Sequence, residues 1–186
     1  MAEKKTEKTE KKKKSRRAYL ESFQKNQEGN YEYKGELYVW QGTGQDRRRE
    51  LARLWGLCIA LLGSLAGAGS VDAPGAINCA YVILPYVINL IAGISVCWGL
   101  CRLSAGGNPV RAYVWKASVE QIPGRAVFAC ISGGASLAGE LIFVVRNGLE
   151  GKTGGFAIFL LLECLVCASS SGMYQRVKKL KWEKQA

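Results

Sequence analysis

The 186-residue sequence contains no histidine. Histidine is the commonest general base and a frequent metal ligand, so its absence excludes the usual hydrolytic triads and argues against a structural zinc site. The chain also lacks a glycine-rich phosphate-binding motif. We therefore expect no enzymatic activity, no metal ion and no other cofactor.

Charged residues are also scarce in four long stretches of the chain, where the ionisable carboxylates are Glu140 and Glu163. A transmembrane helix needs about 20 mostly apolar residues, and each stretch reaches or approaches that length. The sequence thus predicts an all-α integral membrane protein with a four-helix transmembrane domain over residues 51–175, surrounded by the lipid bilayer. The expected spans are approximately 53–70, 79–101, 126–145 and 156–174.

Basic residues lie almost entirely on one predicted side of the membrane. Of the 26 Lys and Arg residues, 15 precede the first span, four lie in the loop between the second and third spans, and five follow the last. Arg146 and Lys152 are the two in the predicted outer turns. Because Lys and Arg favour the cytosolic side, we expect a multi-pass protein of the cell membrane with both termini cytosolic.

The two ends of the chain differ from the spans in composition. Residues 1–30 are rich in basic and poor in apolar side chains, and such a segment cannot bury enough surface to fold. We expect a disordered cytosolic tail over 1–30, a juxtamembrane segment over 31–50 and a basic cytosolic tail over 176–186. Anionic lipid is a candidate partner of the first tail, because each basic residue near an anionic leaflet contributes about 1 kcal/mol. Nucleic acid is not an expected partner.

Two stretches of the chain repeat one pattern at identical spacing. With two spans in each copy, both hairpins have the same orientation, which predicts two tandem hairpins related by a pseudo-twofold axis along the membrane normal. Chance similarity between two apolar helices is the alternative. The matching positions are Arg53 and Arg125, Cys58-Ile59 and Cys130-Ile131, and Ser64-Leu65-Ala66-Gly67 and Ser136-Leu137-Ala138-Gly139.

Small residues recur four positions apart within the repeated helices, at Gly63 and Gly67 in one and at Ala135 and Gly139 in the other. Residues at this spacing share a helix face, and small side chains let another backbone approach closely in lipid. The pattern predicts helix packing within the bundle. A contact face between copies of the chain is the second interpretation.

Aromatic residues precede the first and third spans in a second repeated pattern. Tyr38 and Trp40 flank Val39, and Tyr113 and Trp115 flank Val114. Tyr and Trp are enriched where lipid headgroups meet hydrocarbon, so we expect these four aromatics at the membrane interface. The segment 110–122 is then either a short helix in the membrane plane or an ordinary cytosolic loop.

The two intramembrane carboxylates are the strongest candidates for chemistry. Ionisable residues inside a span are costly and usually face a cavity or a partner. Glu140 and Glu163 could meet at one depth, and Asn89 takes the repeat position of Glu163 when Arg102 is matched to Arg176. These three residues predict a proton or cation site. The alternative is structural, with Glu140 paired to Arg146 or with either carboxylate reaching water.

All seven cysteines lie in or beside the predicted spans. Cys164 and Cys167 form a C-x-x-C on the fourth span, which resembles the quinone-linked thiol oxidoreductases of the disulfide-forming and vitamin K epoxide reductase type. Those families use a second, loop-borne cysteine pair, whereas this chain has only Cys79 near an outer turn. Buried cysteine as a small apolar residue is the plainer interpretation.

The sequence favours an interaction or assembly subunit of a membrane complex or homo-oligomer, whose partner is another membrane protein or a second copy. Short outer turns leave no ectodomain, and the small-residue faces favour contacts between helices. The alternative is a small proton- or cation-coupled carrier or channel subunit that uses Glu140, Glu163 and Asn89. A membrane thiol oxidoreductase using Cys164 and Cys167 is the remote alternative.

Overall fold

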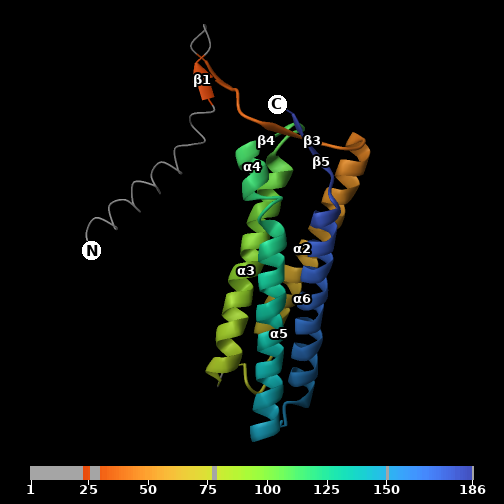
Figure 1. The fold of residues 1–186 in the computed structure, drawn as a ribbon. Helices are drawn as coiled ribbons and strands as arrows, with labels where there is room; N and C mark the ends of the chain where they lie inside the picture. Colours follow the sequence, from red (N-terminus) through yellow and green to blue (C-terminus); the bar gives the residue numbers. More distant parts are fainter. Residues whose placement is uncertain (1–22, 26–29, 77–78, 150, 186) are drawn as a thin grey trace, which may run out of the picture.

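The structure is a computed structural model that describes residues 23–25, 30–76, 79–149 and 151–185. Most of this part of the chain is helical, and its long helices form one bundle (Figure 1). Four of the described helices are long and apolar enough to cross a membrane. The coarse expectation of a mostly helical chain with four candidate spans is therefore confirmed. The predicted tail over 1–30 falls largely outside the described residues.

Each long helix extends beyond its predicted span at one end or both. The predictions followed the apolar stretches, whereas a helix continues through polar residues until its end groups are satisfied. The long helices are α2 (Gly44–Ser70), α3 (Ala80–Ala105), α5 (Ile122–Asn147) and α6 (Thr153–Lys179).

The start of α2 shows why the helix begins nine residues before the predicted span. Thr43 accepts a hydrogen bond from the backbone N–H of Asp46, and the Asp46 carboxylate accepts from the backbone N–H of Thr43. This reciprocal capping box satisfies two backbone donors at once and fixes the helix start. Gly42 and Gly44 therefore flank the capping residue of this helix.

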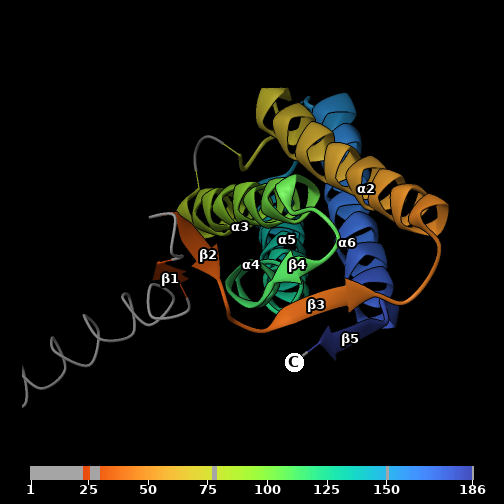
Figure 2. The same ribbon diagram turned by 90° about the horizontal axis from the view of Figure 1, so that it is seen from above.

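The four long helices follow one another around the bundle in chain order, and α6 closes the bundle against α2. Helix α3 packs on α5, α5 packs on α6, and α6 packs on α2, whereas α2 and α3 share much less contact. Figure 2 shows this order along the bundle axis. Helices α3 and α6 are consequently diagonal to each other, as are α2 and α5.

A small antiparallel sheet closes one end of the bundle and corrects the all-α expectation. Its strand order is β4 (Val110–Arg111), β3 (Leu37–Trp40) and β5 (Trp182–Gln185), and a separate pair joins β1 (Phe23–Lys25) to β2 (Tyr31–Tyr33). Three segments that leave the helices at the same end meet here, and pairing satisfies their backbone hydrogen-bonding groups. The chain before α2, the middle loop and the chain after α6 thus lie together (Figure 1).

Residues 110–122 form neither a single short helix nor an ordinary loop. Val110 belongs to β4, helix α4 covers Ala112–Ala117 alone, and Ile122 begins α5. Val110 and Ile122 are both buried. The segment is therefore divided between the sheet, a short helix and the bundle.

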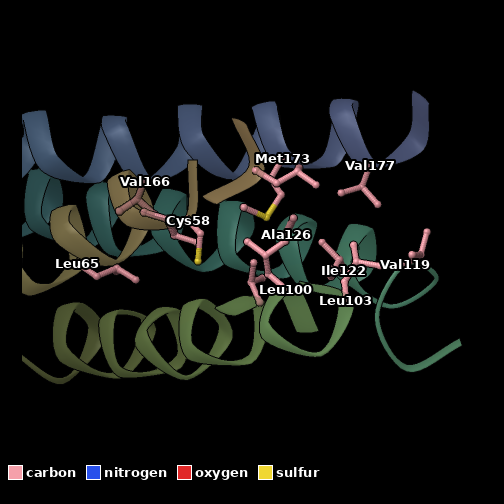
Figure 3. Close-up of a cluster of buried hydrophobic side chains, with 13 residues drawn as sticks. Cys58, Leu65, Leu100, Leu103, Val119, Ile122, Ala126, Val166, Met173 and Val177 are labelled. Carbon is pink, nitrogen blue, oxygen red and sulfur yellow. The ribbon is translucent and has the colours of Figure 1, made fainter. Parts of the chain in front are cut away.

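The apolar core has two parts. The larger cluster lies toward the sheet end and draws side chains from all four long helices, among them Cys58, Leu100, Ala126 and Met173 (Figure 3). A smaller cluster around Phe159 lies toward the opposite end. Asn89 and Glu163, which are described next, lie between these two clusters, and Glu140 lies beside the smaller one.

Candidate functional site

Asn89 and Glu163 meet in the centre of the bundle. Asn89 lies on α3 and Glu163 on the diagonal helix α6, and both side chains have no exposed surface. The Asn89 Nδ2 atom donates a hydrogen bond of 3.3 Å to Glu163 Oε2. This contact joins two of the three residues that the sequence nominated for a proton or cation site.

Helix α5 supplies the space for this contact. A Cβ atom on Gly133 would lie 3.0 Å from Asn89 Nδ2 and 3.2 Å from Glu163 Oε2. Ser136, one turn further along α5, has its hydroxyl near the Glu163 carboxylate, but the two groups do not meet the geometry of a hydrogen bond. Gly133 was not among the predicted site residues, although its place in a predicted span, three residues before Ser136, is a signal in the sequence.

Three oxygen atoms around this pair have no hydrogen-bond partner within the described part of the chain. They are Asn89 Oδ1, Glu163 Oε1 and Ser136 Oγ. A buried polar atom without a partner costs about 1–3 kcal/mol. The group is therefore an oxygen-rich centre whose hydrogen-bonding capacity is only partly used.

Glu140 lies elsewhere. Its side chain is fully buried, and its Oε1 atom accepts a hydrogen bond of 3.1 Å from the backbone N–H of Gly75. Gly75 belongs to the turn between α2 and α3, so Glu140 fastens this turn to α5. No ion pair joins Glu140 to Arg146, and Glu140 Oε2 has no hydrogen-bond partner among the described residues.

The two carboxylates occupy different depths. Gly133 marks the level of Glu163 on α5, and Glu140 lies seven residues further along the same helix, a rise of about 10 Å. The structure therefore brings Asn89 and Glu163 together but leaves Glu140 nearer the end of the bundle opposite the sheet.

The four small residues of the repeated helices have different surroundings. A Cβ atom on Gly139 would lie 2.6 Å from the backbone oxygen of Tyr81, and one on Gly67 would lie 3.2 Å from Leu162 Cδ1. Gly63 and Ala135 are exposed, and a Cβ atom on Gly63 would meet nothing within 4 Å. Gly139 and Gly67 therefore serve packing inside the bundle, whereas Gly63 and Ala135 face outward.

Pro85 explains why α5 approaches α3 so closely at Gly139. Proline has no backbone N–H, so Pro85 cannot donate to the carbonyl of Tyr81 in the preceding turn of α3. Gly139 lies against that same carbonyl. The freed oxygen is thereby covered by protein, which matters because an unsatisfied carbonyl exposed to hydrocarbon costs several kcal/mol.

The four aromatic residues expected at the interface gather at the sheet end of the bundle. The rings of Tyr38 and Trp115 stack with centroids 4.3 Å apart, and Trp40 meets Trp182 edge to face at 5.3 Å. Tyr113 lies 6.1 Å from Tyr33. The two similar sequence patterns nevertheless adopt different structures, because the first forms β3 and the second forms α4.

A mostly apolar cavity separates α2 from α3 at the end opposite the sheet. Its volume is about 480 Å³. Tyr86 crosses beside it and donates a hydrogen bond of 2.8 Å to the backbone oxygen of Leu65. The lining residues are Ala68, Gly69, Ser70, Val71, Asp72, Ala76, Val82, Ile83, Tyr86, Val87 and Phe159. Glu140 and Glu163 do not line this cavity, and Asn89 does not line it either.

The seven cysteines are all unpaired. Cys164 is exposed on α6, and the Cys167 thiol donates to the backbone oxygen of Cys130 at 3.6 Å. Cys79 is buried beside the start of α3. The thiol oxidoreductase interpretation gains no further support from this placement. Among the described residues, no group of three cysteine or acidic side chains is placed to hold a metal ion.

Comparisons with protein-family models, with curated proteins and with solved structures find no match to this chain.

Proposed function

We propose that this chain is an assembly subunit of a membrane complex and that the cavity between α2 and α3 receives an apolar helix of its partner. The observation that carries the proposal is the limited contact between α2 and α3, combined with the apolar cavity of about 480 Å³ between them. The other neighbouring helix pairs in the bundle pack more fully.

The chemistry of the cavity lining supports a helical partner. Val87 is exposed and Ile83 is half-buried, and both present apolar side chains to the cavity. A segment entering at membrane depth must satisfy its own backbone groups, and a helix does so without help from its surroundings. The inserted part would be a few side chains of that helix, which is the scale of a cavity of about 480 Å³.

The outer face of α2 supports the same proposal independently. Gly56 and Gly63 are exposed two turns apart, and a Cβ atom on either would meet nothing within 4 Å. Helices in lipid associate chiefly through close van der Waals contact, which small residues allow. The partner is another membrane protein or a second copy of the chain.

Filling the cavity tests the proposal. Val87 is 42% exposed and lines the cavity, so Val87→Trp should occupy the space without removing core packing. Val145 is 86% exposed on α5, which makes Val145→Trp the matched control. We expect Val87→Trp to release the partner during mild detergent extraction and native electrophoresis, and Val145→Trp to retain it. Equal migration of both variants and the unchanged chain would contradict the proposal.

A second candidate function is a proton- or cation-coupled carrier. The specific observation in its favour is the set of unpaired oxygens of Asn89, Glu163 and Ser136, which resembles the donor set that a hard cation or a proton-carrying water would use. The separation of Glu140 from this centre argues against a single site formed by both carboxylates. Proton flux into vesicles distinguishes the candidates, since Glu163→Gln should abolish flux in a carrier and Glu140→Gln should leave it in place.

A further inference from the structure

A second cavity lies at the sheet end of the bundle and has a different character. Its volume is about 510 Å³, and its lining includes Arg102 from the last turn of α3 and Arg111 from β4. No acidic residue lines it, and neither guanidinium has a carboxylate partner among the described residues. The remaining lining residues are Ala105, Gly106, Gly107, Pro109, Tyr113 and Val114.

Arg111 is held in place by aromatic rings. Its guanidinium carbon lies 5.7 Å from the ring centroid of Phe23 and 5.5 Å from that of Tyr33. Cation–π contacts of this kind leave the guanidinium N–H groups free to bind an anion. The charge is therefore positioned before any ligand arrives.

Arg47 contacts the loop after α3, which forms part of the cavity wall. Its guanidinium donates to the backbone oxygens of Gly106 at 2.6 Å and Gly107 at 3.0 Å. These two carbonyls would repel an anion if they pointed freely into the cavity. Because a cation engages them, the loop that forms the cavity wall presents less negative potential to a ligand.

The depth of the cavity indicates which anion it meets. Trp98 is 68% exposed on α3, four residues before Arg102 and so on the same helix face. Trp98 lies two turns before the end of α3. An exposed tryptophan near the end of a span is typical of the membrane interface, and Arg102 lies about 6 Å beyond it. Ile91 and Ile94 continue the exposed apolar face in the other direction. This face can hold an acyl chain whose headgroup reaches the two arginines.

We propose that the cavity of Arg102 and Arg111 binds the phosphate group of an anionic phospholipid from the leaflet at the sheet end of the bundle. The planar guanidinium presents two N–H groups at a spacing that matches two oxygens of a tetrahedral phosphate, and arginine binds phosphate in this bidentate manner. The site is separate from the predicted contact of the basic tail with lipid, because both arginines belong to the folded bundle and its sheet.

Lipid retention by the purified full chain tests the proposal. The chain is equilibrated in detergent micelles with equal amounts of phosphatidylglycerol and phosphatidylcholine, and bound lipid is counted by native mass spectrometry. We expect preferential retention of phosphatidylglycerol, and a loss of about fivefold in that preference for Arg102→Gln and for Arg111→Gln. Arg102→Lys keeps the charge and should lose less than Arg102→Gln.

The controls separate a built site from general charge attraction and a lipid from a soluble phosphate. Arg146 is exposed in the last turn of α5 at the opposite end of the bundle, so Arg146→Gln removes the same charge away from the cavity. An equal loss of preference for Arg146→Gln and Arg102→Gln would overturn the proposal. Saturable binding of glycerol 1-phosphate or inorganic phosphate without lipid, at millimolar concentration, would overturn the assignment to a lipid.

Discussion

Asn89 and Glu163 are joined by a hydrogen bond and stand 74 positions apart in the chain. The match of Arg102 to Arg176 shifts the sequence by the same 74 positions. A residue can contact its own repeat counterpart only close to the axis that relates the two copies. The predicted pseudo-twofold axis of the two hairpins would therefore run beside this hydrogen bond, between the diagonal helices α3 and α6.

Removing the Asn89 amide should destabilise the bundle. Asn89→Ala leaves Glu163 Oε2 buried without its donor, and we expect a loss of about 1–2 kcal/mol, the scale of hydrogen bonds between helices in lipid. Unfolding by SDS from mild detergent micelles measures the change. Asn147→Ala is the matched control, since Asn147 is exposed and donates only to Phe143 in its own helix. Similar losses of stability in both variants would show that the hydrogen bond between Asn89 and Glu163 does not stabilise the bundle more than an exposed one does.

A pair of glycine substitutions tests the approach of α5 to α3. Gly139→Ala places a Cβ atom 2.6 Å from the backbone oxygen of Tyr81, and backbone cannot move aside cheaply, so we expect a loss of about 1–3 kcal/mol. Gly134 is exposed on the same helix, and a Cβ atom on it would meet nothing within 4 Å. Gly134→Ala should therefore be neutral or slightly stabilising, because alanine favours helix over glycine by about 1 kcal/mol. Thermal unfolding of the two variants in detergent compares them. Equal stability would contradict the close approach.

The sheet end should respond to pH at both extremes. Lys184 Nζ lies 2.6 Å from Glu36 Oε1. This hydrogen bond lowers the pKa of Glu36 and raises the pKa of Lys184. Because the pKa of Glu36 is lowered, its ionised carboxylate stabilises the docking of β5 at pH values above the ordinary carboxyl pKa. This contribution is lost as the pH falls through the pKa of folded Glu36. Because the pKa of Lys184 is raised, its protonated amine stabilises docking at pH values below the ordinary lysine pKa. This contribution is lost as the pH rises through the pKa of folded Lys184.

Fluorine NMR of a fluorinated Trp182 can follow this titration. We expect one signal across neutral pH and a shift toward the undocked position in strong acid and in strong base. In Glu36→Gln the acid-side shift should disappear, because no carboxylate remains to be protonated. An acid response that is unchanged in Glu36→Gln would exclude this ion pair as its origin.

The long helices could be predicted because lipid imposes a strong and simple requirement on composition. Their exact starts depend on local groups that the hydropathy pattern does not register. Thr43 and Asp46 match the capping-box spacing, so the early start of α2 could have been predicted from the sequence. The sheet was harder to predict, because β4 has only two residues and pairs with a strand more than 70 positions away.

The candidate site was predictable in its residue types but not in its pairing. Both Glu140 and Glu163 are ionisable residues in an apolar span, so the sequence indicated them equally as candidates for a proton or cation site. Which of them meets Asn89 depends on helix rotation and depth, which are set by packing at glycines such as Gly133. Likewise, the outward position of Gly63 could not be separated from the inward position of Gly139, because both belong to the same four-residue spacing.

The predicted topology places both ends of the chain in the cytosol. Fluorescent protein fused after residue 186 should therefore fold and fluoresce in the cell, because this reporter matures only on the cytosolic side of a bacterial membrane. Alkaline phosphatase inserted after Gly148, in the turn between α5 and α6, should be active, because that enzyme needs the opposite side. The reverse pattern would contradict the orientation, which rests on the distribution of Lys and Arg.

Site-specific photocross-linking in intact membranes tests the assembly proposal most directly. A photoreactive phenylalanine analogue at Val87 would sit in the cavity between α2 and α3, and the same analogue at Val145 would sit on the exposed face of α5. We expect one discrete protein adduct from position 87, identifiable by mass as another membrane polypeptide or a second copy, and none from position 145. Lipid adducts alone from position 87 would contradict it.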